Sequence, residues 1–512
     1  MKRLCLLFLI LILAISVLAQ SPPTYLVGDF SADELEQMLD LCGKSGIGAL
    51  MQNAPFSSYG HYLWNPDFAK EGDRSVARMV ERAASRGVQL GIYAQTDAIS
   101  LNDSYFSPRY FSRLKRSGKV ELFDWIAADQ REFAMLPDEV FDQPSSLNLM
   151  LVDGELLSYG TMEPAQEVVL LYRCNRGLYG TVAAEHRASA EAYKLWDAPG
   201  RFVAPDGSLR DSVQWHLTQR IETSGLRFVR YPDEPGMHKI DGSIRVRQLE
   251  AWMQEKDSLN AVGKPLELGW FTLRAADGRQ ASTTLEELEW MLSKAAALDA
   301  GYGLVIDRSA IKRHGQLDKM MTMVKAWNQV RDAHVLTKEQ REDLLDPYAD
   351  WHLEPCGEGG YLLYPVQLSR RYRCPVTSTV RPIHEVWTWK ASSQRPVSVS
   401  IEVKGQGEIR QPSLVVGGDT LLFPCTVKTG QMLRCGFNGK AFVMDADHQV
   451  LKTLAMEKQL SLPEGESEVT FSCEVKGAPK MPEVSVRYLI REQPIPIQIE
   501  EKSHSEPDFP VD

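Results

Sequence analysis

The sequence is poor in the patterns that mark metal, phosphate and nucleic-acid sites. It has 8 cysteines in 512 residues, and no two of them form a C-x-x-C pair, which argues against a zinc site. No glycine-rich phosphate loop follows the first predicted strand, so a dinucleotide-binding domain is not indicated. The net charge is −11, and no basic run occurs beyond the N-terminus. We therefore expect no nucleic-acid partner, no cofactor and no metal.

Long apolar runs are equally scarce, and the one at the N-terminus is short. Lys2 and Arg3 precede the apolar segment Leu4–Leu18, and Ala19 supplies a small residue for cleavage. Because a membrane span needs roughly 20 apolar residues, residues 1–19 predict a cleaved secretory signal rather than an anchor. No later segment is apolar enough to span a membrane. We expect a secreted or periplasmic protein without a membrane span, and no pattern indicates its oligomeric state.

Removal of residues 1–19 takes Cys5 away and leaves seven of the 8 cysteines. Five of the seven lie in the last third of the chain. An oxidising compartment permits disulfides, and Cys425 with Cys435 is the simplest pair to form. The odd number leaves at least one thiol unpaired within the chain.

Segments with strand and helix patterns alternate over the first two thirds of the chain. A length of 512 residues exceeds what one core usually holds. Buried-strand patterns occur at residues 25–30, 48–53, 88–94, 226–229, 266–271 and 303–307. Helical periods separate most of them. We predict an α/β fold, a TIM-like (β/α) barrel over residues 20–346, with an open doubly wound sheet as the alternative.

Two stretches break this alternation with β-type patterns. Residues 124–205 carry several short apolar runs, and Asp153-Gly154 between two of them is a strong hairpin signal. We interpret this stretch as a β-rich insertion. The pattern of residues 347–491 indicates short strands separated by turns, which predicts a C-terminal β-sandwich. Residues 492–512 are rich in Pro, Glu and Ser, which predicts a disordered tail.

Chemistry is expected where the predicted barrel strands end. The run Leu226–Val229 is followed by Asp233 and Glu234, with Pro232 and Pro235 beside them. Proline ends a strand ladder, so two adjacent carboxylates stand at a strand's carboxyl end, where barrel enzymes place their active sites. Polar and aromatic residues also occur at or near the other predicted strand ends.

Carboxylates, amides and aromatic rings together suit a sugar site, because two carboxyl groups cleave a glycosidic bond. We assign catalysis to Asp233 or Glu234 with Asp307, and keep Glu267 in reserve. The predicted substrate-binding residues are Asp29, Asn53, His61, Tyr93, Gln95, Asp97 and Trp270. Each has a structural alternative, such as a helix cap or a loop contact.

The segment RGVQLGIYAQTD, residues 86–97, is similar to the third-strand segment of the α-galactosidase-like group of barrel glycoside hydrolases. In that group a β-sandwich follows the barrel, and catalytic carboxylates end the fourth and sixth strands. The resemblance implies that Asp233 is the nucleophile and Asp307 the acid/base. The stretch Tyr231–Pro235 departs from the group's pattern, which leaves Glu234 as the alternative.

A second motif, Cys174–Thr181 followed by His186, resembles a surface β motif of glycan-associated and phage-tail proteins. Its glycines suit tight turns, and we interpret it as structural, with Arg176 and His186 as alternative substrate contacts. Trp387 and Trp389 alternate on one predicted strand face and are interpreted as sandwich core rather than as a sugar platform.

These patterns together predict an exported glycoside hydrolase that acts on a poly- or oligosaccharide by carboxylate acid-base catalysis. A polysaccharide lyase is the first alternative, with Tyr59, His61 or Tyr93 as the base. A non-catalytic glycan-binding protein on an enzyme-like scaffold is the second.

Overall fold

The structure is a computed structural model that describes residues 24–139, 145–198, 201–232, 234, 239–374, 383–416, 418–456, 458–476 and 482–499. The predicted signal at residues 1–19 and the candidate nucleophile Asp233 lie outside the described residues. The chain divides into two compact units. Unit 1 includes Asp29–Glu36 and Met51–Glu234, and unit 2 includes Pro22–Gly28, Gln37–Leu50 and Pro235–Asp512. Each unit is described by itself.

Unit 1 contains one side of a parallel sheet with its helices. Strand β15 (Phe228–Arg230) pairs in parallel with β5 (Gln89–Tyr93), which neighbours β2 (Ala49–Gln52). Helix α3 (Asp73–Ser85) packs on β5 and on α4 (Gly207–Ser224). Gly91 permits the close pairing, because a Cβ added there would lie 2.6 Å from the Phe228 ring.

Unit 2 contains three parallel strands of its own. Strand β17 (Gly301–Ile306) lies between β1 (Thr24–Gly28) and β16 (Glu267–Leu273), and both pairings are parallel. The strand order within this unit is β1-β17-β16. The prediction of an α/β chain with a parallel sheet is confirmed. Closure of that sheet into a barrel stays a prediction.

The helices of unit 2 begin where their sequence signals place them. Thr284 and Thr337 form capping boxes with Glu287 and Gln340, three residues later in each case. Reciprocal hydrogen bonds of this kind satisfy amide groups that have no partner in the first helical turn. The helices are α2 (Leu35–Ser45, which starts in unit 1), α5 (Arg245–Asn260), α6 (Leu285–Leu298), α7 (Arg308–Arg313), α8 (Leu317–Asp332) and α9 (Lys338–Leu344).

The predicted insertion is built of short strands in unit 1 and begins at Arg116, before the predicted residue 124. One sheet has the order β6-β12-β8-β9 and another β10-β11-β7. Asp153 and Gly154 form the β8–β9 hairpin turn with φ values of 46° and 88°, which confirms that prediction. The strands are β6 (Arg116–Glu121), β7 (Phe133–Met135), β8 (Leu149–Val152), β9 (Glu155–Ser158), β10 (Thr161–Ala165), β11 (Val168–Tyr172) and β12 (Glu191–Leu195).

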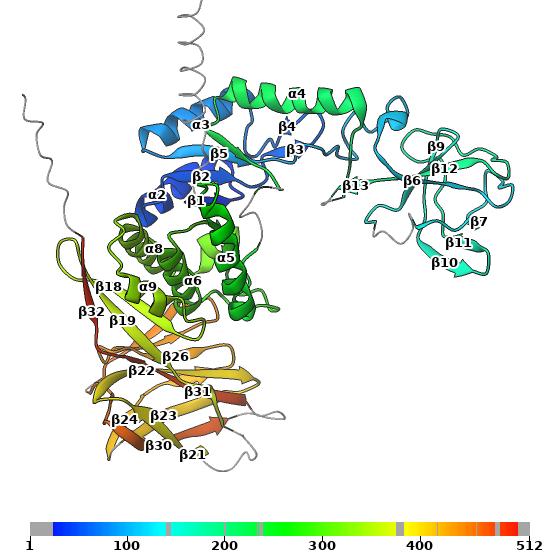
Figure 1. Cartoon of the computed structure of the whole chain (residues 1–512). Coiled ribbons are helices and arrows are strands. Elements are labelled where there is room, and N and C mark those ends of the chain that lie inside the picture. Colours follow the sequence, from blue (N-terminus) through cyan, green and yellow to red (C-terminus); the bar gives the residue numbers. More distant parts are fainter. Residues whose placement is uncertain are drawn as a thin grey trace, which may run out of the picture. The chain divides into compact units, whose positions relative to one another are not determined.

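The C-terminal part of unit 2 contains two antiparallel sheets (Figure 1). The larger contains β18 (Asp350–Pro355), β19 (Gly360–Leu368), β20 (Tyr372–Cys374), β22 (Arg395–Gly405), β26 (Met432–Cys435), β27 (Ala441–Met444), β28 (Val450–Leu454), β29 (Ser461–Leu462), β31 (Pro482–Arg491) and β32 (Ile495–Gln498). The smaller contains β21 (Ile383–Ala391), β23 (Glu408–Val416), β24 (Asp419–Leu422), β25 (Thr426–Lys428) and β30 (Gly465–Lys476).

An apolar core joins the two sheets. Trp389 is fully buried in it, and Trp387 packs against it half-buried, as the core interpretation predicted. Strand β32 pairs with β19 and buries Ile497, so the prediction of disorder from residue 492 is wrong for this segment. The prolines of the segment suit a strand at a sheet edge, where ladder amides are dispensable.

The seven cysteines in the described residues are all free thiols. Cys425 precedes β25 in the smaller sheet, whereas Cys435 ends β26 in the larger one. Both thiols are free, so the predicted Cys425–Cys435 disulfide is wrong. Within the described part of the chain, no helix combines the length and apolar character that a membrane crossing requires.

Candidate functional site

The predicted residues of unit 2 do not share one end of its sheet. Asp307 follows β17, is exposed and caps α7 by accepting from the Ser309 amide at 2.7 Å. Glu267 is the first residue of β16 and is buried. Because β16 and β17 are parallel, Glu267 stands at the sheet edge opposite Asp307. The prediction that Glu267 lies at a carboxyl strand end is wrong.

Trp270 lies in the middle of β16 rather than at its end. Its indole N–H donates to the Tyr25 hydroxyl at 3.0 Å. The ring packs over Gly303, where an added Cβ would lie 2.8 Å from the indole. Its strand-end placement is also wrong, since the side chain covers a face of the sheet.

Glu234 is the described member of the carboxylate pair that follows β15 in unit 1. Its carboxylate lies 2.7 Å from Arg230 Nε, and the two side chains are 30% and 4% exposed. Burial raises the pKa of Glu234, although the charge of Arg230 opposes that rise. A carboxyl group in this state keeps its proton at a higher pH than usual, as a general acid requires.

The end of β5 and the loop that follows it carry three of the predicted substrate-binding residues. The Tyr62 hydroxyl donates to the carbonyl of Gln95 at 2.6 Å. Asp97 lies 3.4 Å from Arg210, and Tyr93, at the end of β5, is half-buried. The structure thus brings Tyr93, Gln95 and Asp97 to the carboxyl end of one strand, as predicted.

Asp29 and Asn53 differ in their surroundings from this loop. Asp29 is exposed and Asn53 is half-buried. The structural contact in this region comes from Gln52, which is fully buried and donates to the Phe30 carbonyl at 2.6 Å. Gln52 thus fixes the end of β2, and Asn53, the next residue, lies half-buried beyond it.

His61 is held by a carboxylate that the sequence analysis missed. Asp103 is buried, and its Oδ1 lies 2.8 Å from His61 Nδ1. Its other oxygen accepts from the Ser58 hydroxyl at 2.6 Å and from the His61 amide at 3.0 Å. Burial would raise the pKa of Asp103, but these hydrogen bonds hold it below its usual value. Asp103 thus stays ionised and orients the imidazole.

A glycine makes this arrangement possible. Gly60 has a φ of 116°, and a Cβ added there would lie 2.7 Å from the Asp103 carboxyl carbon. The backbone can therefore pass directly over the carboxylate only because this residue has no side chain. Gly60 and His61 precede Asp103 by some forty positions that include α3 and β5, so no local spacing signals the contact.

Aromatic rings enclose the imidazole. The His61 ring stacks on Tyr105 with centroids 4.0 Å apart and lies 4.6 Å from His216. The Tyr105 hydroxyl lies 3.1 Å from His216 Nε2. Burial, together with the charge of His61, lowers the pKa of His216. One face of His61 is therefore covered, and a neighbouring imidazole is kept neutral.

The remaining ring nitrogen makes His61 a candidate base. The His61 side chain is 30% exposed, and its Nε2 has no hydrogen-bond partner among the described residues. Tyr59 is a poor base, because burial and the neighbouring Tyr93 raise its pKa to about 12. Among the three predicted bases, His61 has the geometry of an oriented imidazole with one nitrogen open.

A second carboxylate–histidine cluster lies in the insertion and is closed. The Glu155 carboxylate accepts from Arg176 Nε at 2.7 Å and lies 2.8 Å from His186 Nε2. His186 Nδ1 lies 3.0 Å from Asp153, and the His186 side chain is 1% exposed. Because both ring nitrogens and the guanidinium are satisfied inside the fold, the structural interpretation of this motif fits better than a substrate contact.

No cluster of three or more His, Cys, Asp or Glu side chains with the arrangement of a metal site occurs in the described ranges.

Comparisons with known proteins give structural matches only. No protein-family model matches the chain, and no curated protein matches it. An alpha-amylase from Anoxybacillus matches with 9% identity and a TM-score of 0.34 over 90% of this chain and 100% of its own. An alpha-galactosidase from Lactobacillus brevis matches with 8% identity and a TM-score of 0.31 over 90% of this chain and 56% of its own.

A pyruvate kinase from Cryptosporidium parvum matches with 12% identity and a TM-score of 0.28, over 64% of this chain and 75% of its own. The neighbours thus include glycoside hydrolases and an unrelated enzyme class. Similarity at these TM-scores carries no argument, so function is argued from the residues of the chain itself.

Proposed function

We propose that this chain is an exported glycoside hydrolase that cleaves a poly- or oligosaccharide with Glu234 as general acid. The observation that carries the proposal is the position of Glu234, a partly buried carboxyl group that follows β15 and lies 2.7 Å from Arg230 Nε. Burial at this position raises its pKa. A glycosidase needs one carboxyl group that is protonated when substrate binds, so that it can donate to the leaving oxygen. The sequence pattern predicts Asp307 as the second carboxylate.

The surroundings of Glu234 fit this role. The side chain is 30% exposed, so its carboxyl group keeps access to solvent. Arg230 is 4% exposed and fixes the carboxylate from the buried side. The polar loop with Tyr93 and Gln95 follows β5, which pairs with the strand that precedes Glu234. In a sugar site, polar side chains that hydrogen-bond to the sugar hydroxyls are expected beside the catalytic acid.

A second function, a polysaccharide lyase, is favoured by the open nitrogen of His61. In that reaction His61 Nε2 would take the proton beside a uronic carboxylate, and the electron pair of the broken C–H bond would form a C=C bond. The C–O bond to the leaving sugar would break at the same time, and the leaving oxygen would take a proton from water. Asp103 would stabilise the imidazolium that results.

Product analysis with the purified protein on a panel of neutral and uronic polysaccharides separates the two. A hydrolase yields new reducing ends alone, whereas a lyase also yields an unsaturated product that absorbs in the ultraviolet. We expect reducing ends alone, with the rate reduced about 10²–10⁴-fold in Glu234→Gln. Glu222→Gln, an exposed carboxylate on α4, is the matched control and should keep the native rate.

Activity should fall as pH rises, since the proton of Glu234 is then lost, and Glu234→Gln should remove that limb of the profile. A native rate in Glu234→Gln would reject the hydrolase assignment. Unsaturated products that depend on His61 would replace it with the lyase.

A further inference from the structure

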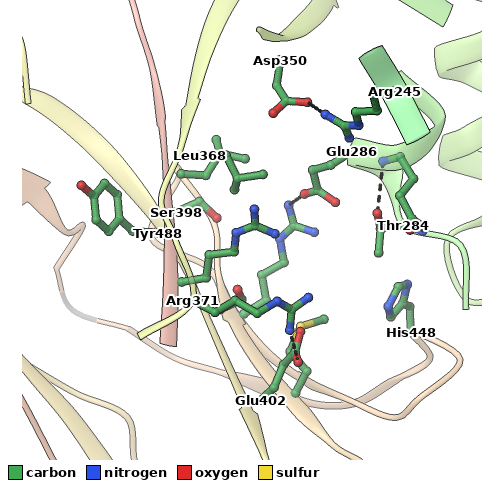
Figure 2. Close-up of a pocket in the computed structure, with 16 residues that line it drawn as sticks. Arg245, Thr284, Glu286, Asp350, Leu368, Arg371, Ser398, Glu402, His448 and Tyr488 are labelled. Carbon is green, nitrogen blue, oxygen red and sulfur yellow. Dashed lines mark hydrogen bonds and ion pairs between the residues drawn. The ribbon is translucent and has the colours of Figure 1, made fainter. Parts of the chain in front are cut away.

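A charged cleft of about 330 Å³ lies in unit 2, between residues of α5 and α6 and the polar face of the larger C-terminal sheet (Figure 2). Its volume falls within the range of small-molecule sites. The proposed carbohydrate chemistry uses none of its side chains. Four arginines and four carboxylates line it: Arg245, Arg371, Arg434, Arg487, Glu286, Glu287, Asp350 and Glu402.

Three of the four guanidinium groups are neutralised inside the cleft. Arg434 pairs with Glu286 at 2.7 Å, and Arg245 pairs with Asp350 at 3.0 Å. The third pair, Arg371 with Glu402 at 2.6 Å, is drawn with its dashed contact in Figure 2.

The fourth carboxylate, Glu287, bonds to the Thr284 amide at 2.9 Å in the capping box of α6. The remaining guanidinium is Arg487. It has no carboxylate within 4 Å among the described residues. Its Nε donates to the Ser369 carbonyl at 2.8 Å, which leaves its two terminal nitrogens without a hydrogen bond in that part of the chain. Burial and the like charge of Arg371 lower the pKa of Arg487, although Glu286, Asp350 and Glu402 oppose that change.

The sheet register places Arg487 opposite a second arginine. Ser400 on β22 pairs with Arg487 on β31 and with Arg434 on β26. The three side chains therefore form a row across neighbouring strands, with the arginine backbones about 10 Å apart. Because Ser400 is small, the space between the two guanidinium groups is not filled by a side chain of the row.

His448 adds a polar atom to the same cleft. It lines the wall, and its Nδ1 is buried without a hydrogen-bond partner in the described structure. A buried polar atom without a partner costs free energy, so such atoms usually meet water or a ligand. Unsatisfied groups from two separate segments therefore line one cavity.

We propose that this cleft binds the oxyanion group of a small molecule, a carboxylate, sulfate or phosphate, at the Arg487 guanidinium over Ser400, beside the Arg434–Glu286 pair. Guanidinium groups bind such oxyanions through paired, charge-assisted hydrogen bonds. The site is independent of the hydrolase proposal, since it involves neither Glu234 nor His61.

Isothermal titration of the full-length protein tests the site with three probes, inorganic sulfate, glucuronate and glucose, at constant ionic strength. Sulfate or glucuronate should bind and glucose should not. Tighter binding of glucuronate identifies an acidic sugar as the ligand, and equal binding identifies the oxyanion alone. Arg487→Gln should weaken binding about tenfold or more, since one charge-assisted contact is lost. Absence of binding to either anion overturns the proposal.

Two further variants keep the test decisive. Arg373→Gln is the matched control, because Arg373 is 76% exposed and lies 3.7 Å from Glu483 on the same sheet; it should bind as the native protein does. Ser400→Asp places a carboxylate between the two arginines and should abolish binding without lowering the melting temperature, which shows folding directly. Native affinity in folded Ser400→Asp or Arg487→Gln overturns the site.

Discussion

Unit 1 contains two buried carboxylates that contact histidines, and their difference separates a structural cluster from a candidate site. Glu155 and Asp103 have similar burial, 3% and 4% exposed. The histidine of Glu155, His186, is 1% exposed and uses both ring nitrogens, whereas His61 beside Asp103 is 30% exposed and uses one. Both clusters pair a buried carboxylate with a histidine. They differ in that one ring nitrogen of His61 is available to a ligand, whereas both nitrogens of His186 are used.

The counter-charges also differ. Glu155 is paired with Arg176 and accepts hydrogen bonds from the backbone amides of Gly177 and Ala184. Burial would raise the pKa of Glu155, but Arg176 and these amides lower it to about 2. Asp103 is stabilised by a hydroxyl and by amides instead, without an arginine contact in the described residues. The Glu155 cluster therefore contributes more to folding stability, whereas the Asp103 cluster keeps His61 accessible.

The largest effect is expected when the Glu155–Arg176–His186 cluster is disrupted. Glu155→Gln leaves the Arg176 charge buried at 5% exposure without its carboxylate, which should cost about 3–5 kcal/mol of local stability. Hydrogen exchange followed by mass spectrometry should show faster exchange in peptides from β8 to β12. Unchanged protection there would mean that the ion pair does not hold the insertion together.

The next effect tests the open cluster. Asp103→Asn should reduce any activity that depends on His61 about 10²–10⁴-fold, with a loss of about 1–3 kcal/mol in unfolding free energy. His61→Gln should give the same rate loss with little change in stability. The double variant should be no slower than either single one, because both residues act through one imidazole. Additive losses would show that Asp103 and His61 act separately.

The smallest effect is the pH dependence that follows from the lowered pKa of Glu155. Its folded-state value of about 2 lies below the ordinary value of 4.5. The stabilisation is therefore present above pH 4.5 and is lost as pH falls from there through about 2. Hydrogen exchange of the insertion, corrected for its intrinsic pH dependence, should show this loss in the native protein. Glu155→Gln should remove it, and a pH-dependent change that persists in that variant assigns it to another group.

Much of the fold could be predicted because its signals are local. The capping boxes at Thr284 and Thr337 and the Asp153-Gly154 turn depend on residues within a few positions of one another. Strand ends were less accurate. Glu267 stands at the start of its strand because β16 runs from Glu267 to Leu273. An apolar run in the sequence does not show where the strand begins and ends.

The candidate site was only half predictable. His61 was recognised as a polar residue in a loop, but its partner Asp103 follows it only after α3 and β5. The pairing depends on Gly60, whose missing side chain lets the backbone reach the carboxylate. Likewise, Cys425 and Cys435 are close in sequence but belong to different sheets.

The sequence by itself determined the α/β alternation, the β-rich insertion and the antiparallel C-terminal region, because hydrophobic period and turn residues act over a few positions. Only the tertiary structure decided that Glu155 is closed by Arg176 while His61 keeps one nitrogen open, and that Arg487 lies across Ser400 from Arg434. These contacts join residues far apart along the chain, and packing and strand register, which the local pattern does not encode, place them together.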